Sequence, residues 1–261
     1  MKQSVKYYIA DAFAEEIFKG NPAGVCVCSE ELSSEIMQKI AFENNLSETA
    51  FLVKRGDGYN LRWFTPLFEI DLCGHATLAS AFVVMNYVEP SINEVRFGTV
   101  SGEITVKRNG ELYEMRFPER IPEKIDVTSE ISEALGIVPN EACSGRDLFA
   151  VLENEKAVRE FVPNYEKLGK LNNWLGIAVT AKGENADFVS RFFCPELKLE
   201  DPVTGSSHSS LVPLWSEKLG KTVLEAEQLS ERGGKLYCEL GDGFVKIAGK
   251  AVLYLKGEIF I

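Results

Sequence analysis

Residues Arg62 to Pro66 read "RWFTP", and residues Arg191 to Pro195 read "RFFCP". Both segments contain Arg, an aromatic residue, Phe, a variable residue and Pro, and the second begins about half a chain length after the first. A glycine-containing turn and a strand-like run precede each segment, and an acidic residue, a glycine and an apolar helix-like run follow it. Self-similarity at this distance indicates two related folding units.

The two segments keep the same order of features with a small difference in spacing. The acidic residue that follows is Asp71 in the first half and Glu200 in the second, and the next glycine is Gly74 or Gly205. The interval from Pro to Gly is two residues longer in the second half, which predicts a longer loop there. The ordered set of matches favours a duplication over two unrelated turn–strand–helix units.

The remaining sequence predicts mostly antiparallel strands with few helices. Residues 53–63, 104–117 and 237–257 join β-forming runs through short Gly-Asp-Gly, Asn-Gly and Gly-Lys turns. Residues 33–44 have apolar side chains at helical spacing behind serines that can cap a helix. Residues 211–219 predict another helix, with Pro213 close enough to its start to be tolerated. We expect an α+β fold of two pseudo-equivalent domains, residues 1–120 and 121–261, with the last strands able to cross back.

Composition excludes several classes of function. The 261 residues include 39 acidic and 28 basic side chains, for a net charge of −11, which argues against a nucleic-acid partner. The N-terminus resembles no signal peptide, and the longest apolar run is too short to span a membrane. The six cysteines are scattered, without a paired zinc-type spacing, and a chain of this size needs no disulfides. We expect a cytoplasmic protein with a small-molecule ligand and, from the commonest soluble arrangement, a homodimer.

The chain has only two histidines, His75 and His208, and each lies in a Gly/Ser/Thr-rich turn before an apolar helix. Free backbone N–H groups and the positive end of the helix dipole favour a carboxylate or a phosphate at such a position. If a pseudo-twofold axis relates the halves, both helix starts would face one cleft between the domains. The alternative interpretation is that these residues only cap their helices.

Glu48 is the acidic candidate, in the segment "NNLSETAFLV" between a helix and a strand. Apolar neighbours could raise its pKa by desolvation, as proton shuttling requires, although many such glutamates are solvated helix ends. Cys73 and His75 suggest a thiolate with an adjacent base, but side chains so close in sequence seldom face each other. A metal site that includes Asp71 and Asp201 would have no recognised spacing. The sequence contains no dinucleotide fingerprint or P-loop, so we expect no cofactor.

Five segments resemble the phenazine-biosynthesis PhzF-like family, whose members are relatives of diaminopimelate epimerase. They are "DAFAEEIFKGNPAGVCV", "NNLSETAF", "FTPLFEIDLCGHATLA", "EDPVTGSSHSSLVPLW" and "EQLSERGGKLY", and they cover nearly the whole chain in order. The resemblance implies two similar domains, each a mixed sheet or barrel wrapped around a central helix, with the active site between them. It also implies a cofactor-independent isomerase that moves a proton on a small carboxylic acid. The enzyme would contain no metal.

The resemblance also implies roles for individual residues. Glu48 would be the principal acid and base, and His75 and Asp201 would support it. His208 would have a structural or supporting role. The ligand would be held mainly by backbone groups at the two helix starts, and the residues expected to bind it are Ser47, Gly74, Ala76, Thr77, Gly205, Ser206 and Ser207.

Two other functions stay open at this point. The related amino-acid epimerases use one thiol from each domain; Cys73 matches the first, but "EDPVTG" offers no cysteine for the second. A one-base proton shuttle is therefore favoured over an epimerase or racemase that uses Cys73. Ser207 and Ser209 depart from the family pattern, which could alter ligand contacts. A non-catalytic protein that binds small acids on the same scaffold is the second alternative.

Overall fold

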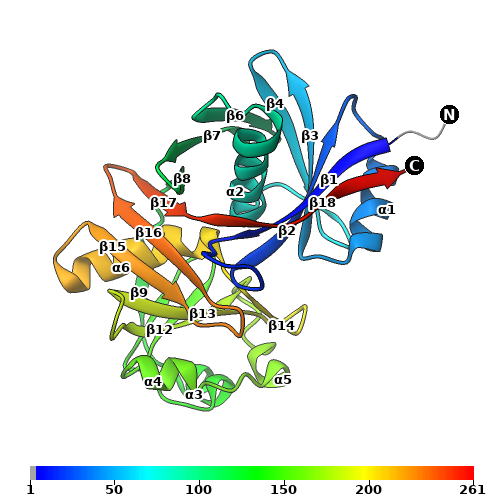
Figure 1. Ribbon diagram of the computed structural model, residues 1–261. Helices are drawn as coiled ribbons and strands as arrows, with labels where there is room; N and C mark the ends of the chain where they lie inside the picture. The colour runs from blue at the N-terminus through cyan, green and yellow to red at the C-terminus, as the bar shows by residue number, and fades with distance from the viewer. Residues whose placement is uncertain (1–3) are drawn as a thin grey trace. The chain divides into compact units, whose positions relative to one another are not determined.

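The computed structural model describes residues 4–261, and the chain divides into two compact units (Figure 1). The first unit contains residues up to Arg116 together with Ala248–Ile261, and the second contains Phe117–Ile247. The divisions fall within strands β8 (Leu112–Pro118) and β17 (Phe244–Gly249). The last strand, β18 (Ala251–Phe260), pairs antiparallel with β1 (Ser4–Ala12), so both ends of the chain belong to the first unit.

The first unit is a mixed sheet with two prominent helices. Strand pairing is antiparallel for β1–β2, β3–β4 and β6–β7, and parallel for β2–β3 and β4–β6. After β1, the elements are β2 (Asn21–Cys28), α1 (Ser34–Asn44), β3 (Glu48–Arg55), β4 (Gly58–Phe64), β5 (Glu69–Ile70), α2 (Gly74–Val83), the π-helix η1 (Val84–Val88), β6 (Glu94–Thr99), β7 (Gly102–Asn109) and β8.

The second unit repeats this pairing scheme. Pairing is antiparallel for β10–β11, β12–β13 and β15–β16, and parallel for β11–β12 and β13–β15. The predicted α+β fold with mixed, mostly antiparallel sheets in two similar halves is confirmed. The elements are β9 (Glu123–Ile125), α3 (Ser129–Leu135), β10 (Glu141–Ser144), β11 (Leu148–Val151), α4 (Glu155–Arg159), α5 (Tyr165–Leu168), β12 (Ile177–Lys182), β13 (Phe188–Cys194), β14 (Leu199–Asp201), the 3-10 helix η2 (Gly205–Ser207), α6 (His208–Leu219), β15 (Val223–Gln228), β16 (Gly234–Leu240) and β17.

The repeated Arg-aromatic-Phe segment makes the same contacts in both units. Arg62 donates from Nε and Nη2 to the two carboxylate oxygens of Glu69, at 2.7 and 2.8 Å. Arg191 donates in the same way to Glu200, at 2.8 Å for both bonds. Each guanidinium carbon also lies 5.2 Å from the centre of a Phe ring two residues further on. Such bidentate pairs fix the orientation of both side chains.

This geometry corrects the alignment of the two halves. The acid equivalent to Glu200 is Glu69, because each accepts two hydrogen bonds from the arginine of its own segment. The sequence-based match of Glu200 with Asp71 was wrong. Glu69 precedes Gly74 by the same interval as Glu200 precedes Gly205, so the two extra residues lie before the acid.

The same alignment makes His208 equivalent to Thr77 instead of His75. Both side chains bond the carbonyl oxygen four residues earlier: Thr77 Oγ1 donates to Cys73 O at 2.5 Å, and His208 Nδ1 donates to Thr204 O at 2.9 Å. His75 and His208 therefore occupy different places in their helices.

Each unit contains a central helix that is largely buried. Every residue of α2 is buried, and the helix packs against β1, β2 and β3. The first nine residues of α6 are also buried, and this helix packs against β15 and β16. Pro213 has no backbone N–H, so it cannot donate the helical hydrogen bond to the Ser209 carbonyl. That carbonyl accepts the backbone N–H of Arg120 instead.

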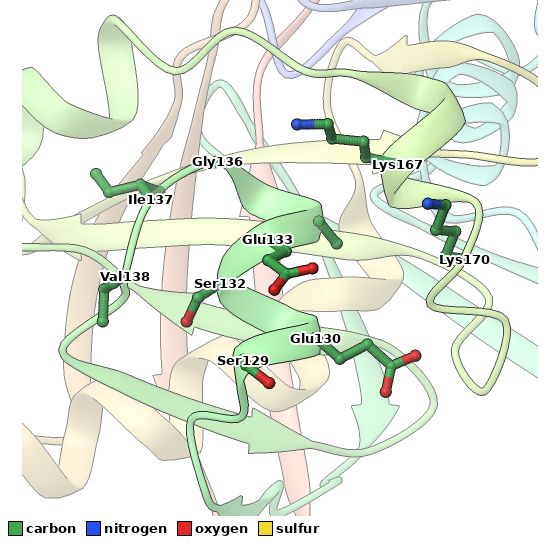
Figure 2. A pocket seen from close by; sticks show the side chains of 10 residues that line it. Ser129, Glu130, Ser132, Glu133, Gly136, Ile137, Val138, Lys167 and Lys170 are labelled. Atoms are coloured by element: carbon green, nitrogen blue, oxygen red, sulfur yellow. The ribbon is translucent and has the colours of Figure 1, made fainter.

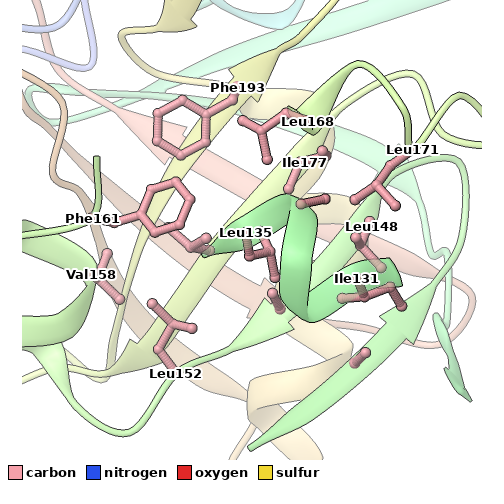
Figure 3. Close-up of a cluster of buried hydrophobic side chains, with 14 of the residues drawn as sticks. Ile131, Leu135, Leu148, Leu152, Val158, Phe161, Leu168, Leu171, Ile177 and Phe193 are labelled. Atoms are coloured by element: carbon pink, nitrogen blue, oxygen red, sulfur yellow. The ribbon is translucent and has the colours of Figure 1, made fainter. Parts of the chain in front are cut away.

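The core of the second unit lies between its sheet and the helices α3, α4 and α5. Figure 3 shows Phe193 and Ile177 from the strands packed with Phe161, Leu168 and Leu135. The rings of Phe161 and Phe193 are 5.3 Å apart. Within residues 4–261, the structure contains no helix with the length and apolar character needed to cross a membrane.

Candidate active site

Glu48 is the first residue of β3, and local structure fixes where it begins. Helix α1 ends at Asn44, and Asn45 takes the left-handed conformation that closes many helices. The Asn44 side chain then donates to Thr49 Oγ1 at 3.2 Å, which ties the helix end to the strand. Glu48 lies opposite Ala23 on the parallel strand β2. The Glu48 side chain is only 16% exposed.

His75 is the second residue of α2, and its buried imidazole meets Glu48. His75 Nε2 lies 3.0 Å from Glu48 Oε2. Both atoms are buried, yet within the described part of the chain neither makes a hydrogen bond of good geometry. Buried polar atoms without an aligned partner are rare and often mark functional sites. The structure thus brings together two of the three residues predicted to be catalytic.

The other face of the imidazole has two further partners. Asn21 Nδ2 lies 3.2 Å from His75 Nδ1, and Cys73 Sγ lies 3.6 Å from the same nitrogen. The expectation that Cys73 and His75 would not face each other was therefore wrong. The extended backbone of Cys73, which precedes the helix, turns its side chain toward the first helical turn.

Sequence reasoning missed Asn21, although it quoted the segment that contains it. Asn21 is fully buried and begins β2. The preceding Gly20 has φ +63°, and a Cβ there would lie 2.1 Å from the carbonyl oxygen of Ala12. Only glycine fits this turn, which delivers Asn21 into the strand beside α2. The signal was a Gly-Asn pair between two strands, which sequence alone interprets as an ordinary turn.

Burial governs the charges in this cluster. Burial raises the pKa of the Cys73 thiol, and the nearby Glu48 carboxylate raises it further, against a smaller lowering by His75. For His75, burial acts against protonation, but negative charge on Cys73 and Glu48 favours it and raises the pKa of the imidazole well above its usual value. The contribution of Cys73 to His75 requires a thiolate, which burial disfavours, so while Cys73 is a thiol this contribution is absent and burial opposes the imidazolium.

Glu48, Cys73 and His75 also form the one group, among the residues that the structure describes, with ligand atoms close enough to hold a metal ion. These atoms lie within 4.8 Å of one another. However, the imidazole turns Nε2 to Glu48 and Nδ1 to Cys73, so a single ring nitrogen does not face both other ligands. We interpret the group as an acid–base cluster.

The start of α2 provides donors beside this cluster. The first backbone N–H groups of a helix have no partner within it, and Cys73 makes no side-chain cap. Gly74, Ala76 and Thr77 are buried in this first turn, with the Thr77 hydroxyl committed to the Cys73 carbonyl. Ser47 is exposed immediately before Glu48. The backbone N–H of Thr77 also donates to the Cys73 carbonyl, at 3.1 Å, so both donors of this predicted ligand contact are already engaged within the helix.

Asp201 ends strand β14 in the second unit, where a buried glutamine organises the loop after it. Asp201 Oδ2 accepts a hydrogen bond from Thr204 Oγ1 at 2.5 Å. Gln228, fully buried, accepts the Thr204 backbone N–H at 2.8 Å and donates to the Asp201 carbonyl at 2.7 Å. The amide thus fixes both ends of the turn that carries Asp201. Sequence reasoning assigned Gln228 no role, because its partners are more than twenty residues away.

The predicted ligand residues Gly205, Ser206 and Ser207 form the short helix η2 that follows this turn. Ser207 Oγ donates to Thr204 O at 2.9 Å, so its hydroxyl supports the turn. Ser206 is partly exposed and accepts from Arg146 Nη2 at 3.1 Å. Arg146 brings positive charge to this helix start, although it also pairs with buried Asp147. Sequence reasoning missed Arg146 as well.

A surface hollow of the second unit lies elsewhere. Figure 2 shows Glu130 and Glu133 of α3 facing the lysines Lys167 and Lys170 across it. None of the residues predicted to be catalytic or to bind a ligand lines this hollow.

His208 is a buried, neutral side chain that packs on Phe188, with ring centres 5.7 Å apart. Burial lowers its pKa from 6.5 to about 4, against a smaller opposing effect of its bond to the Thr204 carbonyl. Sequence reasoning expected a structural or supporting role for His208. Full burial among aromatic rings favours a structural role.

We expect His208 to reduce stability on mild acidification. The unfolded chain takes up a proton at this histidine near pH 6.5, and the folded chain does so only near pH 4. The free energy of unfolding should therefore fall as the pH drops through this window, by roughly 3 kcal/mol in total. Denaturant unfolding at a series of pH values measures this fall. His208→Gln should flatten it, whereas wild-type and variant curves that run parallel would contradict the prediction.

Comparison with known proteins places this geometry in a family. Residues 10–257 match the PhzC-PhzF family, described as phenazine biosynthesis-like proteins. The chain belongs to this family. An "uncharacterized isomerase" of Pseudomonas aeruginosa is 46% identical over 252 residues, which cover 96% of this chain and 97% of that protein. A crystal structure of a PhzC/PhzF protein from Clostridium difficile is 55% identical with a TM-score of 0.96, and the match covers 98% of this chain and 100% of that one.

More distant structures share the fold of the family. A hydroxyproline epimerase from Agrobacterium vitis has a TM-score of 0.68 at 10% identity, over 100% of this chain and 94% of that one. The predicted resemblance to the PhzF-like family and to epimerase-like folds is confirmed. An isomerase-type enzyme is likewise confirmed at the level of the family.

Proposed function

We propose that this protein is a cofactor-independent isomerase that moves a proton on a small carboxylic acid, with Glu48 as the single acid and base. The observation that carries the proposal is the pair of Glu48 Oε2 and His75 Nε2, 3.0 Å apart, buried, and without an aligned hydrogen-bond partner. A carboxylate and an imidazole placed in this way can both turn toward a third molecule. General acid–base catalysis requires such groups within hydrogen-bond reach of the reacting atoms.

The reaction balances without any other reactant. Glu48 removes a proton from a carbon next to a conjugating group, and the electron pair shifts along the conjugated system. Glu48 then delivers a proton to a different carbon, after its own proton has had time to exchange with solvent, so the product has the composition of the substrate. His75 would stabilise the charge that develops between these steps.

Backbone donors would hold the substrate during this transfer. The unpaired N–H groups at the start of α2, beside Glu48 and His75, suit a carboxylate group. Asp201 would orient the substrate from the turn that Gln228 fixes. These groups would therefore bind and orient the substrate. The proposed proton transfer uses no metal or cofactor.

The test is a set of small unsaturated carboxylic acids incubated with the protein in deuterated water. A substrate should gain deuterium at a carbon position, followed by mass spectrometry and proton NMR, and should form an isomer of the same composition. Acids that bind, as seen by a shift in the melting temperature, but never exchange would instead support a binding protein without catalysis.

A second candidate is an epimerase or racemase in which Cys73 acts on the substrate. The contact of 3.6 Å between Cys73 Sγ and His75 Nδ1 favours it, because an imidazole can accept a thiol proton. Cys73→Ser would then abolish exchange while Glu48→Gln retained it. The one-base proposal requires the reverse result.

A further inference from the structure

The amide of Asn21 restricts where the protons of the acid–base cluster can lie. Its Nδ2 atom is 3.2 Å from His75 Nδ1. An amide nitrogen can only donate a hydrogen bond, so the ring nitrogen that faces it must accept. Asn21 is fully buried, and an amide donor turned toward a protonated ring nitrogen there would lose this bond without water to replace it.

Cys73 Sγ contacts the same ring nitrogen, Nδ1 of His75, as Asn21 does. The cluster therefore has two possible arrangements with the same number of protons. In the first, Cys73 is a thiol and His75 is neutral with its proton on Nε2. In the second, Cys73 is a thiolate and His75 is an imidazolium with protons on both nitrogens. The second arrangement places an N–H on Nδ1, directly against the amide donor of Asn21. The contact with Asn21 therefore favours the first.

We propose that Asn21 is a positioning residue that holds His75 as the neutral Nε2–H tautomer and keeps Cys73 as a thiol. The proton on Nε2 then lies on the side of the ring that faces Glu48, 3.0 Å away. The imidazole can donate toward Glu48 or toward negative charge on a bound acid. Glu48 then serves as the base of the cluster, and the thiol is withheld from that role.

The second histidine supplies an internal reference for this assignment. His208 Nδ1 lies 2.9 Å from the carbonyl oxygen of Thr204. A carbonyl can only accept, so Nδ1 of His208 carries the proton. The two histidines of the chain are thus expected to be opposite tautomers, which a single spectrum can distinguish.

The test is an NMR spectrum of the wild-type protein with isotope-labelled histidine ring nitrogens, recorded near neutral pH. One ring should carry its proton on Nε2 and the other on Nδ1, and His208→Gln should remove the second set of signals. Two rings of the Nδ1–H type, or an imidazolium at His75, would overturn the proposal. The wild-type spectrum alone decides this point.

Asn21→Asp provides the matching variant, because it replaces one donor group by an acceptor with almost no change in volume. A carboxylate at this position should draw the His75 proton to Nδ1 and change its signals to the type seen for His208. Asn60→Asp makes the same substitution at an exposed position of the first unit and should leave both rings unchanged. A His75 ring that keeps its Nε2 proton in folded Asn21→Asp would contradict the role of Asn21.

The catalytic consequence rests on the proposed function. Asn21→Asp should lower the rate of deuterium exchange at least tenfold and shift its pH profile, while Asn60→Asp should not. The two proposals fail separately: the spectra can show opposite tautomers when no acid exchanges, which would refute only the isomerase proposal. Full exchange and an unchanged pH profile in Asn21→Asp would refute the positioning role instead.

Discussion

Glu48→Gln should lower the rate of proton exchange into the substrate by about 10²–10⁴-fold, the usual contribution of a positioned acid or base. The substitution keeps the shape of the side chain and removes the carboxylate that lies 3.0 Å from His75 Nε2. A glutamine amide cannot accept and return a proton at neutral pH. The measurement is the rate of deuterium incorporation into a substrate identified with the wild-type protein.

Glu43→Gln is the matched control for this experiment. Glu43 lies in α1, close to Glu48 in sequence, but its side chain is exposed. Its substitution should leave exchange unchanged, and both variants should show wild-type thermal melts by circular dichroism. A Glu48→Gln protein that exchanges at the wild-type rate would refute the one-base mechanism. Exchange that disappears together with the melt would assign Glu48 a role in folding.

The fold could be predicted largely because its strongest signals are local or repeated. The short Gly-Asp-Gly and Asn-Gly turns define hairpins, and each occupies only a few residues. The second Arg-aromatic-Phe segment revealed the duplication, and the structure gives that segment a cause in the pairs Arg62–Glu69 and Arg191–Glu200. The sequence comparison matched Asp71 instead of Glu69 with Glu200, because it assumed equal spacing from the proline. The insertion in the second loop lies between the proline and the acid, so this spacing differs.

The site was predicted less completely, because much of it depends on contacts between distant segments. Glu48 and His75 were named as candidates, and the structure places them in contact. Asn21 reaches His75 across 54 positions, and Gln228 reaches Thr204 across 24. Asn and Gln are common surface residues, and nothing in their own neighbourhoods indicates full burial. Asn21 gains its partner only because β2 packs beside α2 in the folded chain. Gln228 gains its partner only because β15 lies beside the turn after β14.

Phe193→Ala should lower the free energy of unfolding by about 3–5 kcal/mol, the usual cost of removing a buried Phe side chain. Phe193 is fully buried, and its ring packs against Phe161 (Figure 3). The same ring also contacts the guanidinium of Arg191. The substitution therefore leaves a cavity and also removes the ring against which Arg191, the partner of Glu200, lies. Typical domains are stable by only about 5–15 kcal/mol, so the loss should appear as a large decrease in the urea midpoint.

Phe42→Ala is the control that separates burial from residue type. Phe42 lies on α1 with 65% of its surface exposed, and its removal should change stability by less than about 0.5 kcal/mol. Equal losses for both variants would contradict the packing that Figure 3 shows. Because Glu200 immediately precedes Asp201, Phe193→Ala should also disturb the turn that Gln228 fixes. Exchange activity should then fall in folded Phe193→Ala, while Phe42→Ala keeps the wild-type rate.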